Sequence, residues 1–463
     1  MKILYAASEA VPFCKTGGLA DVAGSLPPAL AEQGAETAVI LPLYRRVREK
    51  FADQLTFLCY DYVDLAWRHT YCGLFSMKKD GVIWYFLDNE QYFDRPELYG
   101  YVDDGERFGF FSRAVVKMLD HLEFWPDVIH CNDWQTALIP IYLKDDGVRE
   151  DRYRSIRTVL TIHNIEYQGR YDPYCLGDLF GLDRGWVDDG TLLLDGDLNL
   201  LKGAILTADA VNAVSPTYAQ ELKNPYFAHR MEGILTQCGY KLSGVLNGID
   251  MKLYDPTADG RITANYTAED LSGKAADKTA LQNLMGLNEE PNTPIIAMVS
   301  RLVSHKGLDL LREVMGDIME LPAQFVVLGS GDAGYEEFFR RTAERYPGRM
   351  AVRLGYNEAL SMAIYAGADL FLMPSRSEPC GLSQMISMRY GTVPIVRETG
   401  GLKDTVPPAD ENGEGAKELK NVAGGDIDLA KVVLAEDRLR VLQEDRELFE
   451  QPKYSGFVHV VPS

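Results

Sequence analysis

The chain alternates short apolar segments with amphipathic segments along most of its 463 residues. The apolar segments have the length of buried strands, and the segments between them carry apolar residues at helical spacing. The predicted strands are 3–7, 37–41, 82–87, 128–131, 158–162, 211–214, 295–300, 325–328, 351–354, 370–373 and 393–396. The predicted helices include 19–32, 107–122, 308–320, 335–345 and 382–390. Such alternation produces parallel sheets covered by helices, so the sequence predicts an α/β, doubly wound fold.

The length of the chain and a polar break near its middle indicate two such sheets. A chain of 463 residues can build two doubly wound domains, each with its own core. The polar interval 247–294 contains the turn formers Gly248, Pro256, Gly260 and Pro291. We therefore predict Rossmann-like domains at 1–246 and 247–405. Ligands of doubly wound sheets bind beyond the carboxyl ends of the strands, so the chemistry is expected in a cleft.

Charge and composition exclude several classes of protein. The formal net charge of −21 argues against general affinity for nucleic acid, which relies on clustered Lys and Arg. No apolar run approaches membrane-spanning length and the N-terminus lacks a signal pattern, so we expect a cytoplasmic protein without membrane partners. The seven cysteines lack metal-binding spacing, which indicates neither a disulfide framework nor a zinc site.

A lysine and two glycines lie between the first predicted strand and the first predicted helix. Gly17 and Gly18 let backbone N–H groups approach an anion, the helix N-terminus carries partial positive charge, and Lys15 adds a full charge. This arrangement predicts a phosphate site. The alternative is a turn that needs glycine for positive φ, with Lys15 solvated.

Three further loops of this kind follow predicted strands in the second half. Arg301 and Lys306 follow the strand at 295–300, and both are suited to phosphate oxygens. Glu378 follows the strand at 370–373. The alternatives are solvated cations and a glutamate that caps a helix or pairs with its dipole. The strand at 393–396 is followed by Thr399, Gly400 and Gly401.

Together, the segments 15–22, 301–308 and 378–382 resemble the bacterial glycogen synthases and plant starch synthases. Similarity also appears at 132–135, 163–164, 167–169 and 247–250, so the resemblance covers about residues 1–405. It implies the GT-B fold, with two Rossmann-like domains facing across a deep cleft. It also implies a retaining glucosyltransferase that moves glucose from ADP-glucose to the non-reducing end of an α-1,4-glucan and elongates glycogen. No metal or cofactor is implied, because ADP-glucose is a substrate.

The resemblance assigns roles to single residues. Arg301 and Lys306 would neutralise the leaving diphosphate, and Glu378 suits the positive charge at the anomeric carbon. His163 would lie near the donor glucose; the alternative is a core histidine that ends a buried strand. Asp21 would orient a sugar hydroxyl or only cap its helix. The donor and phosphate-binding set is Lys15, Gly17, Gly18, Asp21, Asn247, Cys380, Gly381, Leu382, Thr399, Gly400 and Gly401.

Acceptor binding is expected to use aromatic residues of the first domain, because sugar faces stack on rings. The candidates are Tyr92, Tyr99, Tyr101 and Trp134, each of which can equally be a packing residue. Retention is compatible with a carboxylate nucleophile or with a front-face route in which the leaving phosphate takes the acceptor proton. The position eight after Glu378, where some related transferases carry a second glutamate, is Ile386. We therefore favour the front-face route.

The resemblance stops after Thr405, and we predict a divergent C-terminal segment at 406–463. In the family this region continues into helices, the last of which braces the first domain. Two hypotheses follow. The protein is a working glycogen synthase, or it is a nucleotide-sugar or glucan-binding protein whose divergent segment leaves it with weak or no transferase activity.

Overall fold

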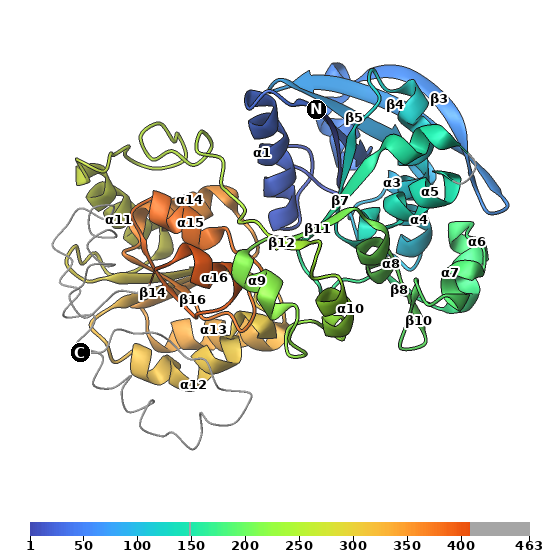
Figure 1. Ribbon diagram of the computed structural model, residues 1–463. Coiled ribbons are helices and arrows are strands. Elements are labelled where there is room, and N and C mark those ends of the chain that lie inside the picture. The colour runs from blue at the N-terminus through green and yellow to red at the C-terminus, as the bar shows by residue number, and fades with distance from the viewer. Residues whose placement is uncertain (148–149, 408–463) are drawn as a thin grey trace. The chain divides into compact units, whose positions relative to one another are not determined.

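A computed structural model of the protein describes residues 1–147 and 150–407 (Figure 1). The chain divides into two compact units, of which the first is Met1–Gly248 and the second begins at Ile249. Each unit is described by itself. The acceptor and donor roles predicted for the two parts stay predictions. Residues 408–463 of the predicted divergent segment lie outside the described residues.

The first unit is built on a nine-stranded sheet with the order β12-β11-β7-β6-β1-β2-β5-β4-β3. Its central strands are apolar and almost fully buried, as expected for strands covered on both faces. All the strands predicted in this part of the sequence are confirmed. The strands are β1 (Lys2–Ala6), β2 (Glu36–Pro42), β3 (Thr56–Leu65), β4 (Arg68–Lys79), β5 (Val82–Asp88), β6 (Val128–Asn132), β7 (Arg157–Ile162), β11 (Ala210–Ala213) and β12 (Leu242–Gly244).

One edge of this sheet differs from the prediction of purely parallel strands. β4 is antiparallel to both β3 and β5, so the sheet is mixed. The sequence analysis missed β3 and β4 because β3 is largely exposed and carries no continuous apolar run. An antiparallel edge can leave one face in water, which a strand inside a parallel sheet cannot do.

Helices of the first unit cover the sheet and position its loops (Figure 1). The predicted helix at 19–32 is confirmed as α1 (Gly18–Glu32), and the one at 107–122 as α4 (Asp104–Met118) with a short 3-10 turn after it. The first unit also contains a small antiparallel sheet of β8 (Arg170–Tyr171), β9 (Leu193–Leu194) and β10 (Asp197–Asn199). The other helices are α2 (Arg45–Phe51), α3 (Glu90–Phe93), α5 (Leu138–Gly147), α6 (Leu176–Phe180), α7 (Gly185–Asp188), α8 (Leu200–Thr207), α9 (Pro216–Glu221) and α10 (Glu232–Gln237).

The second unit contains a five-stranded, entirely parallel sheet with the order β15-β14-β13-β16-β17. Each of its strands was predicted from the sequence. The strands are β13 (Ile295–Val299), β14 (Gln324–Gly329), β15 (Met350–Leu354), β16 (Leu370–Met373) and β17 (Val393–Val396). Among the described residues, no helix of either unit is long and apolar enough to cross a membrane.

Helices cover both faces of this second sheet, which confirms the doubly wound prediction. Ile295 and Ala297 of β13 point into one core, and Ile296 and Met298 into the other, because side chains alternate along a strand. The first core is closed by α11 (Ser272–Met285), α14 (Glu358–Gly367), α15 (Ser383–Arg389) and α16 (Gly400–Thr405). The second is closed by α12 (Leu308–Ile318) and α13 (Ala333–Arg345), which lie together in Figure 1.

Candidate active site

The predicted site residues of the second unit follow three neighbouring strands. Lys306 lies after β13, Glu378 after β16 and Gly400 after β17. These strands are adjacent and parallel, so their carboxyl ends meet at one edge of the sheet. The fold therefore gathers residues that are up to about a hundred positions apart in the sequence into one cluster of loops.

The centre of this cluster is an ion pair between Lys306 and Glu378. Lys306 Nζ lies 2.6 Å from Glu378 Oε2, and Ser375 Oγ donates to the same oxygen at 2.8 Å. Glu378 is 7% exposed. Burial opposes ionisation of the carboxyl, yet Lys306 and the Ser375 hydroxyl together hold the pKa of Glu378 below its ordinary value. Glu378 is therefore ionised at neutral pH.

Glu378 does not cap a helix, which was the alternative interpretation of its position. The next helix, α15, begins at Ser383, and the Glu378 carboxylate is occupied by Lys306 and Ser375. The carboxylate is fixed by tertiary contacts between two loops. Such fixation is what a group needs if it is to act on charge that develops in a reaction.

Gly307 allows the two loops to come together. Its φ is 72°, and a Cβ at this position would lie 2.0 Å from the carbonyl oxygen of Pro374. The approach is also held by the Arg376 N–H, which donates to the His305 carbonyl at 2.8 Å. A side chain at residue 307 would push Lys306 away from Glu378, so the glycine is required by this contact.

The glycine pair after β17 packs against the backbone of the Glu378 loop. A Cβ at Gly400 would lie 1.9 Å from the Glu378 carbonyl oxygen, and one at Gly401 would lie 2.2 Å from that of Cys380. The Gly401 N–H donates to the Glu378 carbonyl at 3.1 Å, so this donor is used within the protein. Phosphate binding by Thr399, Gly400 and Gly401 stays a prediction, as it does for Cys380, Gly381 and Leu382.

Arg301 is an exposed cation just beyond β13. Across residues 1–147 and 150–407, no ion pair involves its guanidinium. An unpaired arginine next to the Lys306 loop offers its planar set of donors to an anion. Tyr356 follows β15 at the same edge of the sheet and is 69% exposed. The sequence analysis did not select Tyr356, although an aromatic residue directly after a predicted strand was a usable signal.

The Lys15 loop of the first unit follows β1 and leads into α1. Lys15 Nζ lies 2.7 Å from Asp21 Oδ1, and their side chains are 33% and 16% exposed. Gly17 caps α1 with a φ of −151°, which is extended backbone that any residue adopts. The alternative in which Gly17 supplies positive φ is therefore wrong. The N-terminus of the fifteen-residue α1 remains suited to an anion.

Glu9 shapes this loop and was missed by the sequence analysis. Its Oε2 accepts hydrogen bonds from the Thr16 N–H at 2.5 Å and from the Thr16 hydroxyl at 2.8 Å. Glu9 is 3% exposed, and burial raises the pKa of its carboxyl to about 7 despite these bonds. The sequence carried no signal of this burial, because an acidic residue a few positions after a strand is most often exposed.

His163 follows β7 and is held as a neutral imidazole. Its Nε2 lies 2.9 Å from Asn132 Oδ1, and the Asn132 amide is oriented by donation from Nδ2 to the Ala6 carbonyl. Because that oxygen can only accept, His163 Nε2 carries the proton. Burial lowers the pKa of His163 to about 3. The ring is therefore uncharged at neutral pH.

Asp133 fixes the backbone at His163 from the neighbouring strand. Its Oδ1 accepts from the His163 N–H at 2.7 Å and from the Asn164 N–H at 3.3 Å. Burial raises the pKa of this carboxyl to about 7. Asp133 has a φ of 55° and a ψ of −172°, a conformation that non-glycine residues rarely adopt. The observed strain coincides with the predicted site.

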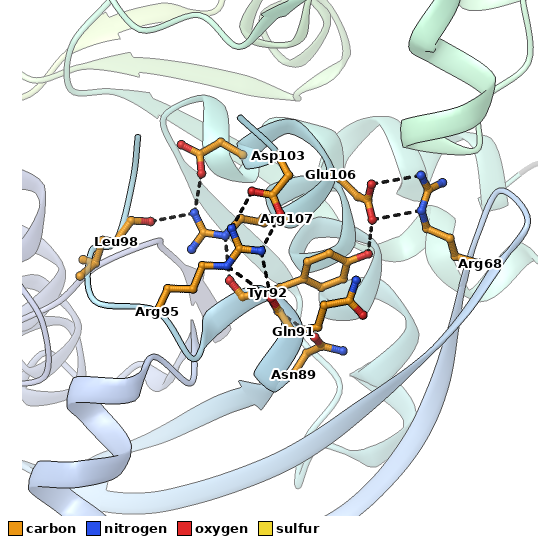
Figure 2. Close-up of polar contacts among 10 residues, drawn as sticks. Arg68, Asn89, Gln91, Tyr92, Arg95, Leu98, Asp103, Glu106 and Arg107 are labelled. Carbon is orange, nitrogen blue, oxygen red and sulfur yellow. Dashed lines mark hydrogen bonds and ion pairs between the residues drawn. The ribbon is translucent and has the colours of Figure 1, made fainter. Parts of the chain in front are cut away.

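Tyr92, a predicted acceptor residue, lies inside a polar network (Figure 2). It is 2% exposed, and its hydroxyl donates to Glu106 Oε1 at 2.5 Å. Arg68 forms two bonds of 3.0 Å to the same carboxylate, and Arg107 Nε donates to the Tyr92 carbonyl at 2.7 Å. The ring is enclosed by the first unit, so its observed contacts are those of a packing residue. Its acceptor role stays a prediction.

Tyr99 and Trp134, two of the other acceptor candidates, lie at the carboxyl edge of the first sheet. Tyr99 and Ser8, which follows β1, share a hydrogen bond of 2.7 Å between their hydroxyls. Trp134 follows β6 and is half-buried, with its ring centroid 5.4 Å from that of Phe108. Tyr101 contacts the Arg95 guanidinium. Asn247 lies after β12 at the end of the first unit.

Two protein-family models match the chain. The model of the starch synthase catalytic domain matches residues 2–237, and that of glycosyl transferases group 1 matches residues 284–418. The first model alone spans half of the chain. The two matched ranges together contain both loop clusters described above.

Similar proteins agree with these matches. The glycogen synthase of Lactobacillus acidophilus is 48% identical over 411 residues, which is 89% of this chain and 86% of that protein. That of Bacillus anthracis is 48% identical over 416 residues, or 90% of this chain and 87% of that protein. The catalytic domain of starch synthase IV from Arabidopsis thaliana, solved with ADP and acarbose, superimposes with a TM-score of 0.81 at 31% identity. The superposition covers 96% of this chain and 98% of that one.

Proposed function

Because this chain belongs to the family of bacterial glycogen synthases and plant starch synthases, we propose that it transfers glucose from ADP-glucose to an α-1,4-glucan with retention. It is a glycosyltransferase with the GT-B fold. The observation that carries the finer proposal is the buried Lys306–Glu378 pair in the same loop cluster as the exposed Arg301. The relative solved with ADP and acarbose supports an adenosine diphosphate donor and a glucan acceptor.

The cations of the second unit match the charge of the leaving group. When the bond between glucose and diphosphate breaks, negative charge accumulates on the phosphate oxygens. Arg301 offers a fork of donors, and Lys306 offers a compact charge already fixed beside Glu378. Fixed charges of this kind stabilise a transition state without reorganising at the moment of reaction. We propose that these side chains act in place of a metal ion.

Glu378 supplies the opposite charge. Its ionised, oriented carboxylate suits the positive charge that develops at the anomeric carbon, or a sugar hydroxyl that it would grip. His163 stays neutral down to a pKa of about 3, so it does not exchange a proton at neutral pH. In this proposal it contributes hydrogen bonding and its backbone carbonyl, with its position set by Asp133.

Retention is proposed to follow the front-face route. The bond from C1 of glucose to the phosphate oxygen breaks, and the bond from C1 to O4 of the acceptor forms on the same face. The proton of the acceptor 4-hydroxyl passes to the leaving phosphate oxygen, so no second carboxylate is needed. Ile386, eight positions after Glu378, supports this route because it is 7% exposed and belongs to the apolar core of the second unit.

The test is incorporation of labelled glucose into glycogen from ADP-glucose and, in parallel, from UDP-glucose. The wild-type protein is expected to prefer ADP-glucose, and Glu378→Gln is expected to lower kcat by about a thousandfold or more. Glu358→Gln is the matched control, because Glu358 pairs with Arg261 on the surface of the same unit with a side chain 59% exposed.

Two results would contradict the proposal. If the Glu378→Gln variant incorporated glucose at the wild-type rate, Glu378 would have no part in the reaction. Wild-type protein that binds ADP in calorimetry without incorporating glucose would instead support a nucleotide-sugar or glucan-binding protein without transferase activity.

A further inference from the structure

The outer face of the β3–β4 hairpin carries a row of exposed aromatic rings. On β3, Phe57, Tyr60 and Tyr62 are 50%, 57% and 43% exposed, and on β4 Tyr71 is 37% exposed. The ring of the exposed His69 stacks on Tyr62, with centroids 4.6 Å and planes 7° apart. We call these five residues the aromatic platform. Contiguous exposed apolar surface of this kind marks binding sites on soluble proteins.

The register of the two strands makes the platform continuous. Tyr62 lies directly opposite Tyr71, and the ring centroids of Tyr60 and Tyr71 are 5.8 Å apart. Tyr60 lies opposite Gly73, so no side chain separates Tyr60 from Tyr71 at that position. Tyr60, Tyr62, Tyr71 and His69 therefore form one surface, and Phe57 lies farther along β3 with its ring against Phe75.

Gly73 keeps the Tyr71 ring over the sheet. A Cβ at Gly73 would lie 2.6 Å from the Tyr71 hydroxyl oxygen. With no side chain there, the Tyr71 ring extends over the backbone of the strand. The platform thus depends on a glycine that makes room for one of its rings.

The platform does not contribute to the hydrophobic core. The opposite face of the same hairpin does so, with Val63 and Cys72 completely buried. On that inner face Asp61 pairs with Lys117 of α4 at 3.2 Å. The hairpin is therefore held by its inner face, and the rings on its outer face are available for another task.

We propose that the aromatic platform binds a stretch of the α-1,4-glucan acceptor, away from the chain end that is elongated. This inference rests on the proposed function, which supplies a polymeric acceptor. The C–H faces of glucose units pack on aromatic rings, and tyrosine hydroxyls reach the sugar hydroxyls. The platform also suits a neutral ligand, since it contains no Lys, Arg, Asp or Glu, and the His69 Nδ1 lies 2.6 Å from Asp64 Oδ1.

A second copy of the chain is the other occupant to consider, because β3 is an edge strand. Features of β3 oppose strand pairing between copies. The register of β3 shifts between Phe57 and Cys59, and Asp64 adds an exposed carboxylate to this edge strand. Bulges and charges are devices by which edge strands avoid pairing with other molecules. The same features do not hinder a glucan that lies on the ring faces.

The test compares a long and a short acceptor in the triple variant Tyr60→Ser, Tyr62→Ser, Tyr71→Ser. Glycogen affinity, measured by affinity electrophoresis of the full chain, is expected to fall about tenfold, because the stacking of three rings on the glucan is lost. The KM for glycogen is expected to rise as the affinity for glycogen falls, while kcat and the KM for maltotetraose stay at wild-type values. Tyr240→Ser is the control, as Tyr240 is 85% exposed elsewhere in the first unit.

Gly73→Ala serves as a second variant, because it displaces Tyr71 without removing a ring and is expected to weaken glycogen binding by a smaller factor. Unchanged glycogen affinity in both variants would overturn the proposal. A change of mass in light scattering with unchanged glycogen affinity would also overturn it, in favour of a second copy. Wild-type protein that binds glycogen through the platform without transferring glucose would refute the proposed function and leave the platform intact.

Discussion

Each unit holds a lysine–carboxylate pair in a loop beyond a central strand, and the two pairs are built differently. Lys15 and Asp21 are six residues apart, and their side chains are 33% and 16% exposed. Lys306 and Glu378 are 72 residues apart, with side chains 16% and 9% exposed, and Ser375 donates to the same carboxylate. The first pair joins a loop to the first turn of the helix that follows it, and the second joins the loops that follow two different strands.

The difference teaches what each pair can do. A partly exposed pair is weak and screened by solvent, so Lys15 can leave Asp21 for an incoming phosphate at little cost. A buried pair with an extra hydrogen bond is held in one geometry, and removing either partner leaves an uncompensated charge. We therefore expect Lys15 to affect mainly donor binding and Lys306 to affect the chemical step.

Of the two lysine variants, Lys306→Ala is expected to have the larger effect, with a loss of about a hundredfold or more in kcat for glucose incorporation. The variant also leaves the buried Glu378 without the cation that lowers its pKa. The pKa of Glu378 then rises, so residual activity should fall as the pH drops below neutral, where the wild-type protein keeps Glu378 ionised.

Lys278→Ala is the matched control for this variant. Lys278 and Asp369 form a 2.8 Å pair in the same unit with side chains 12% and 15% exposed. Asp369 immediately precedes β16, at the amino end of the sheet, away from the candidate site. If Lys278→Ala lowered kcat as much as Lys306→Ala does, the loss would come from breaking a buried ion pair, and not from the position of that pair at the carboxyl edge of the sheet.

A smaller effect is expected for Lys15→Ala, seen mainly as a KM for ADP-glucose about tenfold higher with kcat less affected. The physical reason is that Lys15 adds one attractive charge beside the N-terminus of α1. Initial rates over a range of donor concentrations measure it. Lys78→Ala, which removes an exposed lysine of the same unit, should leave both constants unchanged. If Lys15→Ala lowered kcat as much as Lys306→Ala does, the two pairs would not differ in function as inferred here.

The last prediction concerns the folding stability of the protein and its dependence on Glu9, and not the activity. Burial raises the pKa of Glu9 to about 7, so the folded protein favours the protonated carboxyl. The stability that the protonated carboxyl gives to the folded state is fully present below the ordinary pKa and is lost as the pH rises through 7. Glutamine does not ionise, so the Glu9→Gln variant does not lose this part of its free energy of unfolding, which amounts to about 3 kcal/mol at most. Relative to wild type, its melting temperature should therefore improve between about pH 4.5 and pH 8.

Asp21 contributes to the raised pKa of Glu9, and the pKa of the coupled Asp133 is itself raised to about 7, so the comparison reports the ionisation of Glu9 together with its coupling to these carboxyls. Parallel melting curves for the two proteins across this range would show that Glu9 does not titrate as inferred.

The sequence predicted the fold more fully than it predicted the contacts of the site. The strands at 295–300 and 370–373 were recognisable because buried parallel strands are continuous apolar runs. The hairpin of β3 and β4 was not, since tyrosines alternate with acidic residues on a strand that has one face in water. Glu9 was missed for a different reason, because a lone acidic residue after a strand gives no sign of its burial.

By itself the sequence determined the alternation of strands and helices, the strand-end position of each candidate residue, and the family. These properties are local or depend on residue pattern alone. Only the tertiary structure decided that Lys306 meets Glu378, that Gly307 permits this approach, and that Glu9 is buried. Such contacts depend on which strands become neighbours in the sheet, and that is settled by long-range packing of the whole unit.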